Sequence, residues 1–361
     1  MSYRWTMTGA RKPLVREDTP IPEPAAREAV VEVVGCGVCH TDLAFLFDGV
    51  RPRHPLPIAL GHEIAGTVVA AGDWAQDWIG RDVVVPAVMP CGTCTACAAG
   101  RGTICSRQKM PGNDIHGGFA SHVRVPADGL CEVPHPGPDG HIGQSGCTLA
   151  QLAVMADAVT TPYQAICRSG LARNDVAVIV GLGGVGGFCL QICAARGAHV
   201  VGIDCDPERL EAHAGGRSLL LDSTGLAPKE VRSRVHDYAE EMGASQREWK
   251  IFECSGTPGG QATAWGSLVH GSYLSVIGFS LAKMEVRLAH LMALDATAEG
   301  NWGCLPELYP EVLDLILEGV IKIPPFVELH PMSDIQAVIE DLHRGRLRRR
   351  PVLTPVPEGA A

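Results

Sequence analysis

A glycine-rich turn between a buried strand and a helix constrains the fold of this chain more than any other feature. The apolar segment 176–180 leads into Gly181-Leu-Gly-Gly-Val-Gly186, and residues 188–196 have the apolar spacing of a helix. A second apolar segment, 199–203, ends at Asp204, at the roughly 20-residue distance that is typical of a dinucleotide-binding unit. In such a unit the glycines let a pyrophosphate approach the backbone at the N-terminus of the helix.

The same segment indicates which cofactor binds. Asp204 is placed to accept hydrogen bonds from both ribose hydroxyls and to repel a 2′-phosphate, which favours NAD over NADP, and nearby Arg209 weakens that preference. Further strands are expected at 249–253 and 271–278, and strands that alternate with helices predict a doubly wound parallel sheet. The predicted cofactor-binding residues are Gly181, Gly183, Gly184, Val185, Gly186, Asp204 and Arg209.

Four cysteines in a short Gly-rich loop have the spacing of a structural metal site. They follow the pattern C-x2-C-x2-C-x7-C, at Cys91, Cys94, Cys97 and Cys105. Four thiolates suit a closed tetrahedral zinc site, which would stabilise the fold of a loop that has no hydrophobic core of its own. An iron–sulfur cluster also uses C-x2-C-x2-C, but its usual fourth Cys follows after three residues and precedes Pro, whereas Ser106 follows here. We therefore expect structural zinc in this loop.

Catalytic metal sites use ligands that are widely spread in the sequence, and three segments of this chain provide them. Cys39, the pair His62 and Glu63, and Asp157 supply a thiolate, an imidazole and carboxylates. On its own, Asp157 is more typical of a helix cap or an exposed carboxylate than of a metal ligand. A charge inside the apolar, helix-patterned stretch 143–164 nevertheless needs a partner.

The segment before the first of these ligands leaves an alternative open. Gly35 and Gly37 are expected to let the backbone turn tightly and present the thiol of Cys39. Cys36 and Cys39 could instead form a CxxC redox or zinc pair, which spacing alone does not exclude. We favour Cys39 alone as the ligand, because His62 follows in a Gly-flanked loop.

The bulk composition excludes several classes of protein. A length of 361 residues suggests two domains, and 46% apolar with 19% charged residues indicates a folded chain. A net charge of -10 argues against a general nucleic-acid binder. Because no apolar run reaches the roughly 20 residues that cross a membrane, and the first residues have no signal-peptide core, a cytoplasmic protein is expected. In that reducing compartment we interpret Cys167, Cys189, Cys193 and Cys304 as small core hydrophobes.

Taken together, these motifs resemble the zinc-dependent medium-chain alcohol dehydrogenases. Gly37–Asp42, Gly61–Glu63, the four-Cys loop and the nucleotide glycines occur in the order of that family, over nearly the full chain. The resemblance implies an α/β fold with a GroES-like, mostly β catalytic domain at 1–157 and 298–361 and a Rossmann NAD-binding domain at 158–297. It also implies one catalytic and one structural zinc ion per chain, NAD, and a homodimer or homotetramer. We expect the strand at 273–279 to be the edge at which subunits pair.

Matched residue to residue, the resemblance assigns roles around the catalytic zinc. Cys39 and His62 match two ligands, and Asp157 stands where the family most often has a second Cys and some members have Asp. Glu63 resembles a neighbouring carboxylate that can move onto the metal. Asp42 resembles the acceptor that orients His62.

The resemblance also implies a path for the substrate proton. Thr41 matches the hydroxyl that takes this proton and passes it towards the nicotinamide ribose. The family's frequent relay His, three residues further on, is Ala44 here, so His40 and His54 are the candidates for the outer end of the path. The catalytic residues implied are therefore Thr41, Glu63 and His40.

Three short loops carry a narrower similarity. Segments 51–54, 110–120 and 300–303 resemble the 6-hydroxycyclohex-1-ene-1-carbonyl-CoA dehydrogenases of anaerobic benzoyl-CoA degradation. That resemblance implies NAD-dependent oxidation of a ring alcohol to 6-oxocyclohex-1-ene-1-carbonyl-CoA. A CoA ester on an acidic protein needs cations for its phosphates. The candidates are Arg51, Arg53 and Lys109, with Lys283 and Arg287 behind them. The run Arg346-Leu-Arg-Arg-Arg350 could also bind phosphate but is more typical of a solvated turn.

Other functions compete with this one. A general secondary alcohol, polyol or threonine dehydrogenase keeps all of these motifs and differs only in its substrate pocket. A zinc-free quinone or enoyl reductase shares the fold but lacks ligands at Cys39 and His62. A nucleotide-binding protein without catalytic activity would not need the open metal group.

Overall fold

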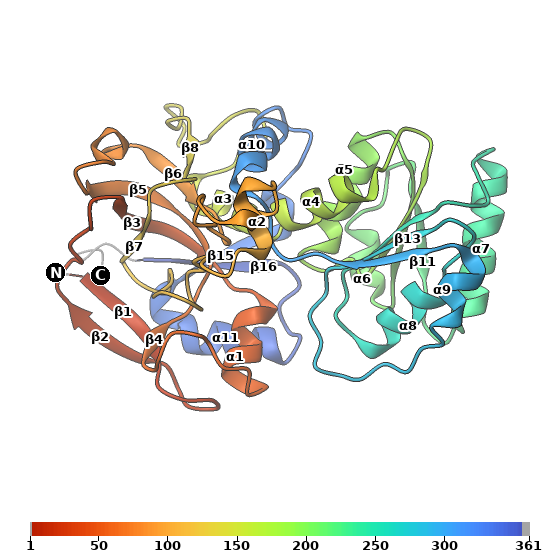
Figure 1. The fold of residues 1–361 in the computed structure, drawn as a ribbon, viewed down its shortest axis with the longest axis horizontal. Helices are drawn as coiled ribbons and strands as arrows, with labels where there is room; N and C mark the ends of the chain where they lie inside the picture. Colours follow the sequence, from red (N-terminus) through yellow and green to blue (C-terminus); the bar gives the residue numbers. More distant parts are fainter. Residues whose placement is uncertain (1, 356–361) are drawn as a thin grey trace. The chain divides into compact units, whose positions relative to one another are not determined.

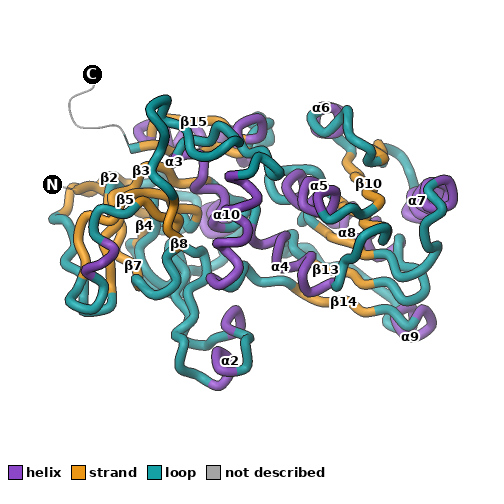
Figure 2. The backbone as a smooth tube through the Cα atoms, turned by 90° about the horizontal axis from the view of Figure 1, so that it is seen from above, coloured by secondary structure: helices purple, strands orange, loops and turns teal. Residues whose placement is uncertain are grey.

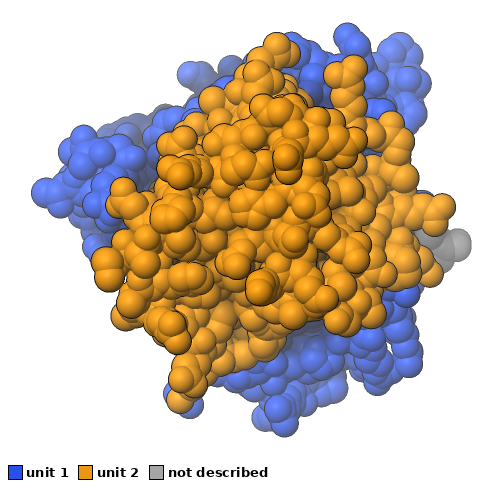
Figure 3. Space-filling model, turned by 90° about the vertical axis from the view of Figure 1, so that its right-hand side faces the viewer, with its two compact units in different colours: residues 1–160, 303–361 blue, residues 161–302 orange. Residues whose placement is uncertain are grey.

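The computed structural model describes residues 2–355, and the chain divides into two compact units. Unit 1 comprises residues 1–160 and 303–361, and unit 2 comprises residues 161–302 (Figure 3). Unit 1 is therefore discontinuous in sequence, because unit 2 is inserted between its two segments. Within residues 2–355, no helix is both long enough and apolar enough to cross a lipid bilayer.

Unit 1 is built mainly from antiparallel strands (Figure 1). Among the described residues, one sheet has the order β2-β1-β4, and a larger sheet has the order β15-β16-β3-β5-β6-β8, with β7 also paired to β3. The strands are β1 (Ser2–Met7), β2 (Val15–Thr19), β3 (Glu28–Gly37), β4 (Ile58–Ala59), β5 (Glu63–Ala71), β6 (Asp82–Val85), β7 (His122–Pro126), β8 (Cys131–Val133), β15 (Val327–Pro331) and β16 (Arg350–Thr354).

Short helices complete unit 1. The α-helices are α1 (His40–Phe47), α2 (Thr95–Ala98), α3 (Leu149–Leu152), α10 (Tyr309–Leu317) and α11 (Ile335–His343). The 3-10 helices are η1 (Gln76–Trp78), η2 (Gly102–Ile104), η3 (Ala153–Ala156), η4 (Pro306–Leu308), η5 (Pro324–Phe326) and η6 (Met332–Asp334). β-Branched residues of the long strands, such as Val31 and Ile64, pack with Phe119 and with Ile335 of α11 into one buried core. This core fixes the strands and helices from which the candidate ligands project.

Unit 2 contains the predicted doubly wound parallel sheet. In the described residues the strand order is β11-β10-β9-β12-β13-β14, and all of these neighbours are parallel. The strands are β9 (Val176–Val180), β10 (His199–Asp204), β11 (Leu219–Asp222), β12 (Lys250–Glu253), β13 (Tyr273–Val276) and β14 (Thr297–Gly300). The helices are α4 (Thr160–Ser169), which begins at the unit boundary, α5 (Gly186–Ala195), α6 (Pro207–Glu211), α7 (Pro228–Glu241), α8 (Pro258–Gly266) and α9 (Ala289–Leu294).

The edge of this sheet differs from the prediction. β13 is not the edge strand, because β14 pairs along its outer side. β14 has the sequence Thr-Ala-Glu-Gly and is exposed at every position. It therefore lacks the apolar pattern by which a strand is recognised in a sequence.

Candidate active site

Three segments of unit 1 bring metal-ligating side chains together. Cys39 caps the N-terminus of α1, His62 and Glu63 lie at the start of β5, and Asp157 follows η3. One ligand atom from each of these residues lies within 4.8 Å of the others. Asp157 Oδ2 is 3.8 Å from Cys39 Sγ and 3.6 Å from His62 Nε2. Ligands held about 2.0–2.3 Å from a tetrahedral zinc ion lie roughly 3.3–3.8 Å apart, so this donor set fits the ion.

The glycines that precede the cysteine ligand do not form the tight turn expected from the sequence. Gly35 and Gly37 both continue strand β3. A Cβ on Gly35 would lie 2.4 Å from Ala150 O, and a Cβ on Gly37 would lie 2.0 Å from Glu63 Oε2. The glycines are thus explained by close packing against the ligand-bearing segments. Cys36 is buried, donates to Gly37 O at 3.7 Å and is not among the four residues of the ligand group. Cys36 and Cys39 are both free thiols in this structure.

Asp42, which is buried in α1, fixes two ligand segments through their backbones. Its Oδ2 accepts from Cys39 N at 2.9 Å, and its Oδ1 accepts from Gly61 N at 3.1 Å. Asp42 Oδ1 is 3.8 Å from His62 Nδ1, which is too far for a hydrogen bond. Asp42 therefore holds the loops on either side of the ligand group and is not the direct acceptor expected for His62.

Glu63 forms a buried ion pair that the sequence did not reveal. Arg350, at the start of β16, donates from Nε to Glu63 Oε2 at 2.8 Å and from Nη2 to Glu63 Oε1. Burial opposes the charge of Arg350, but the Glu63 carboxylate raises the pKa of Arg350 above its usual range. The interpretation of this arginine run as a solvated turn is wrong for Arg350, although Arg348 and Arg349 are exposed. The one feature of the sequence that could have indicated burial of Arg350 is its position at the start of the last apolar strand.

The residues expected to move the proton occupy different environments. Thr41 Oγ1 is 3.8 Å from Cys39 Sγ, which places a hydroxyl beside the ligand group. His40 is the first residue of α1 and its side chain is exposed. His54 donates from Nδ1 to Pro55 O at 2.6 Å, and its ring lies 4.7 Å from that of His116. His40 lies between Cys39 and Thr41 in the sequence, whereas His54 contacts Pro55 and His116. His40 is therefore the better candidate of the two for the outer end of the proton path.

The four-Cys loop closes as its spacing predicts. One sulfur from each cysteine lies within 4.8 Å of the others, and Cys94 Sγ is 3.4 Å from Cys97 Sγ and 3.7 Å from Cys105 Sγ. Zinc–sulfur distances of about 2.3 Å give sulfurs roughly 3.8 Å apart, so the group fits one zinc ion. Figure 2 shows the loop, with α2, standing out from the rest of unit 1. Its neck is closed by hydrogen bonds of 2.9 and 2.8 Å between the backbones of Met89 and Lys109.

The dinucleotide loop lies in unit 2 at the carboxyl end of β9. Gly181 has a φ of +90°, and a Cβ there would lie 2.6 Å from Ser255 Cα. A Cβ on Gly186 would lie 1.7 Å from Gly181 O. A Cβ on Gly183 would meet nothing closer than Arg209 Nη1 at 3.7 Å, so the backbone is open at this position. The loop thus fits a pyrophosphate that approaches the start of α5.

Asp204, the last residue of β10, lies beside this loop, at the position expected to contact the ribose of the cofactor. The carboxylate is 6% exposed. It accepts from Leu182 N at 2.7 Å, from Cys205 N at 2.8 Å and from Asp206 N at 3.0 Å. Arg209 Nη1 lies 3.8 Å from Asp204 Oδ2. Asp204 is therefore an anchored negative charge that Arg209 partly compensates.

The cations suggested for a CoA ester are exposed. Arg53 N donates to Asn113 Oδ1 at 3.1 Å, and Arg53 Nη1 pairs with Asp114 Oδ1 at 3.4 Å. Loop 51–54 therefore lies against segment 110–120, which carries the same narrow resemblance. Lys109 lies at the neck of the four-Cys loop. The exposed members of the set are Arg51, Arg53 and Lys109 in unit 1 and Lys283 and Arg287 in unit 2.

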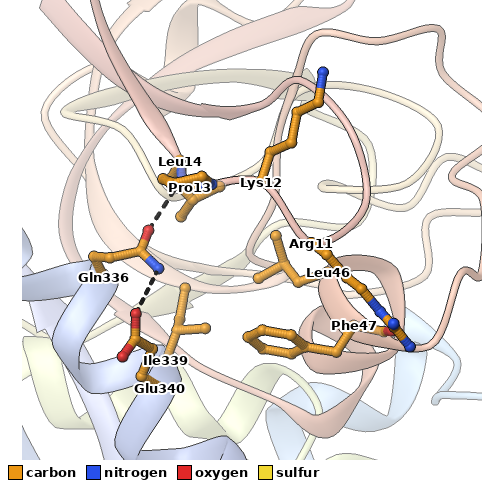
Figure 4. Close-up of a pocket in the computed structure, with 9 residues that line it drawn as sticks. All are labelled: Arg11, Lys12, Pro13, Leu14, Leu46, Phe47, Gln336, Ile339 and Glu340. Atoms are coloured by element: carbon orange, nitrogen blue, oxygen red, sulfur yellow. Dashed lines mark hydrogen bonds between the residues drawn. The ribbon is translucent and has the colours of Figure 1, made fainter.

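A small surface hollow lies elsewhere in unit 1, between the β1–β2 connection, the end of α1 and α11 (Figure 4). Phe47 forms part of its apolar lining. Gln336 accepts from Leu14 N at 3.1 Å and donates to Glu340 Oε1 at 3.3 Å. The residues that line this hollow include none of the predicted site residues, so it is distinct from the ligand group.

Comparison with known proteins agrees with this architecture. Residues 25–135 match the alcohol dehydrogenase GroES-like domain, and residues 184–318 match the zinc-binding dehydrogenase family. The chain is 30% identical over 359 residues to D-arabinose 1-dehydrogenase (NADP(+)) of Saccharolobus solfataricus, covering 95% of each chain. It is 27% identical over 349 residues to an alcohol dehydrogenase of Geobacillus stearothermophilus, covering 95% of this chain and 96% of the relative.

A solved structure is similar to this chain over nearly its full length. Acetophenone reductase from Geotrichum candidum, in complex with NAD, aligns with a TM-score of 0.83 and 26% identity, covering 99% of this chain and 98% of the reductase. The family match, the sequence identity over nearly the full length and the two metal-ligating groups all indicate the same family. The chain belongs to the zinc-containing medium-chain alcohol dehydrogenases, oxidoreductases that act on CH–OH groups.

Proposed function

We propose that this protein oxidises a secondary alcohol or polyol to the carbonyl compound with NAD. The observation that carries the proposal is the convergence of Cys39, His62 and Asp157, with the hydroxyl of Thr41 3.8 Å from the Cys39 sulfur. When bound, zinc supplies a Lewis acid that lowers the pKa of the alcohol, and NAD supplies the hydride acceptor. The relatives named for alcohols and for D-arabinose support a hydroxylated substrate.

The side chains of the ligand group balance charge and move the proton. Cys39 as thiolate and Asp157 as carboxylate contribute two negative charges, while His62 binds as a neutral imidazole, so the set neutralises a divalent ion. Glu63 is already neutralised by Arg350 and adds no net charge in this arrangement. The hydroxyl of Thr41 would accept the substrate proton while it gives up its own, and exposed His40 would take up that second proton and release it to solvent.

The cofactor-binding loop supports NAD as the cofactor. Asp204 holds its negative charge at the carboxyl end of β10 through three backbone hydrogen bonds. A 2′-phosphate placed there would meet that charge, whereas ribose hydroxyls would donate to it. Arg209 weakens this discrimination, and the Saccharolobus relative is named for NADP(+). We therefore propose a preference for NAD with residual use of NADP.

A CoA ester is a second, more specific candidate for the substrate. The loops 51–54 and 110–120, which resemble the 6-hydroxycyclohex-1-ene-1-carbonyl-CoA dehydrogenases, pack together through Asn113. Arg51 and Arg53 lie exposed on the first of these loops and could receive the phosphates of a CoA ester. On this hypothesis the product is 6-oxocyclohex-1-ene-1-carbonyl-CoA.

One assay separates these candidates. NAD reduction is followed at 340 nm with zinc-loaded protein and a panel of secondary alcohols, polyols, threonine, and cyclic hydroxyacyl-CoA esters with their free acids. Turnover of alcohols or polyols supports the main proposal. Turnover of the 6-hydroxycyclohexenyl CoA ester alone selects the narrower function, and its loss in the double variant R51A/R53A would assign those cations. Failure of every hydroxyl substrate would refute both.

We also propose that the protein is a homodimer, or a homotetramer of such dimers, that works in the cytoplasm. β14 is the last strand in its sheet, and the apolar residues Phe279, Leu288 and Met292 of the same unit are 48%, 72% and 78% exposed. An antiparallel pairing of two β14 edges about a twofold axis would cover this surface. Sedimentation of the variant L288E/M292E should then show a smaller species. Thiol ligands at both metal groups suit a reducing compartment.

A further inference from the structure

A buried tyrosine hydroxyl lies between two backbone segments of unit 1 that carry different metal-ligating groups. Tyr309, the first residue of α10, is 0% exposed. Its hydroxyl accepts from Ala87 N at 3.1 Å and donates to Ala156 O. Burial raises the pKa of Tyr309, so the hydroxyl keeps the proton that it donates. Both ends of this bridge are backbone groups, so the tyrosine joins two main-chain segments directly.

One end of the bridge anchors the segment that bears a candidate ligand. Ala156 ends η3 and directly precedes Asp157. Asp157 has φ -138° and ψ -56°, so the helical path is interrupted at the ligand itself. The carboxylate is therefore carried by a residue at which the regular helical backbone ends. The carbonyl of Ala156 also accepts from Thr160 Oγ1 at 3.1 Å, so two hydroxyls hold the same peptide group.

The other end of the bridge lies at the base of the four-Cys loop. Ala87 connects β6 to the neck at Met89. The segment that leads to Tyr309 packs along the same connection. A Cβ on Gly303 would lie 2.6 Å from Val88 Cγ2, and a Cβ on Gly102, inside the loop, would lie 3.0 Å from Leu305 Cδ2. The loop therefore rests on the segment that ends in the tyrosine.

We infer that Tyr309 is a positioning residue that holds Asp157 in its ligand position and couples that position to the four-Cys loop. The inference rests on the proposed metal site at Cys39, His62 and Asp157, and it is independent of the substrate. Groups that orient a ligand without touching the metal typically change metal affinity about 10- to 100-fold when they are removed. Because the hydroxyl of Thr160 remains on the same carbonyl, Tyr309→Phe is expected to weaken metal binding about 10-fold, at the lower end of that range.

The test compares two variants that each remove one tyrosine hydroxyl. Tyr238 donates to Arg217 O at 3.2 Å in unit 2, so Y238F is the matched control. Cobalt is loaded at the site of Cys39, its visible absorption is recorded, and its affinity is measured by competition with a chelator. Y309F should bind cobalt about 10-fold more weakly, with altered absorption bands and zinc still retained in the four-Cys loop. Y238F should match the parent protein.

Several outcomes would overturn the inference. Equal cobalt affinity and spectra in Y309F and the parent would remove it, and so would joint loss of both metals with a lower unfolding temperature. If Y309F does not fold, the pair Thr160→Val and Thr160→Ser tests the same carbonyl: only the first should weaken cobalt binding. Absence of cobalt binding in the parent protein would instead refute the proposed metal site itself.

The coupling to the loop is tested by a double-mutant cycle. Cys97→Ser removes one sulfur of the four-Cys group. It should weaken cobalt binding at Cys39 in the parent protein and have a smaller further effect in Y309F, because the bridge is already lost. Strictly additive effects would show that the loop does not act through Tyr309.

Discussion

Arg350 Nε lies 2.8 Å from Glu63 Oε2, and the two side chains, 7% and 0% exposed, form a bidentate ion pair beside the candidate ligand group. These residues come from the two separate segments of unit 1, since Glu63 begins β5 and Arg350 begins β16. The pair lets a carboxylate remain charged in a buried position within 4.8 Å of the other ligands. The last strand of the chain is therefore part of the electrostatic structure of the site.

Removal of this guanidinium should destabilise the fold strongly. Arg350→Ala leaves the Glu63 carboxylate buried and unpaired, which typically costs about 3–5 kcal/mol. Urea unfolding followed by circular dichroism measures the change. The neighbouring exposed Arg349→Ala is the control and should change the free energy of unfolding by less than about 0.5 kcal/mol. Similar effects of the two variants would contradict a buried pair.

The ligand role of Asp157 predicts a change in zinc content. Asp157→Ala should reduce bound zinc from two ions to one per chain, whereas Asp157→Cys should restore the second ion, because a thiolate suits the same position. Zinc is measured by atomic emission after gel filtration. The exposed carboxylate Asp139 provides the control variant D139A. Retention of both ions in D157A would rule out Asp157 as a required ligand.

The charge of Asp204 should set the choice of cofactor. Asp204→Asn keeps an acceptor of the same size but removes the charge, so the KM for NAD should rise about 10- to 100-fold and the preference over NADP should narrow. Initial rates with both cofactors give the selectivity ratio. Asp222→Asn, at the exposed end of β11, should leave that ratio unchanged. An unaltered ratio in D204N would show that a group other than Asp204 discriminates between NAD and NADP.

His116 should make stability depend on pH. Burial and the Arg4 guanidinium lower the pKa of His116 to about 4, and Ala59 N donates to its Nδ1 at 3.2 Å. The unfolded residue has a pKa near 6.5, so between roughly pH 6.5 and 4 only the unfolded chain takes up the proton and stability falls as pH falls. Because the ring is only half-buried, we expect a loss of roughly 1–2 kcal/mol over this range.

Substitution provides the check on this pH dependence. Unfolding by urea at several pH values should show a shallower decline in His116→Gln than in the parent. The exposed His135→Gln is the matched control and should keep the parent slope. If H116Q declines as steeply as the parent, another group is responsible.

Features with a local signature could be predicted from the sequence. The strand, glycine turn and helix of the dinucleotide loop follow from residues near one another, and so does the four-Cys loop, because short spacing alone brings four sulfurs together. The residues Cys39, His62 and Asp157 could be proposed as one group from their residue types, and the resemblance to a family supported Asp157 as a ligand. The structure then places them around one centre.

Features that depend on distant packing could not be predicted. Arg350 sits in a run of arginines, and nothing in that run indicates which member is buried. Gly35 and Gly37 have the composition of a turn, but the need for a small residue comes from Ala150 and Glu63. β14 has no apolar pattern because it is exposed at every position. For Arg350 and the two glycines, the cause lies in a partner far away in the sequence.

The discontinuity of unit 1 has a consequence for the order of events on the ribosome. The nascent chain contains all of unit 2 before it contains any residue after 302. At that point Glu63 has no guanidinium to pair with, and the carbonyl before Asp157 lacks the hydroxyl of Tyr309. The nucleotide-binding unit can therefore fold during synthesis, while the ligand-bearing unit must wait for the final segment to emerge. The candidate metal site can therefore be completed only after the segment that carries Tyr309 and Arg350 has been synthesised.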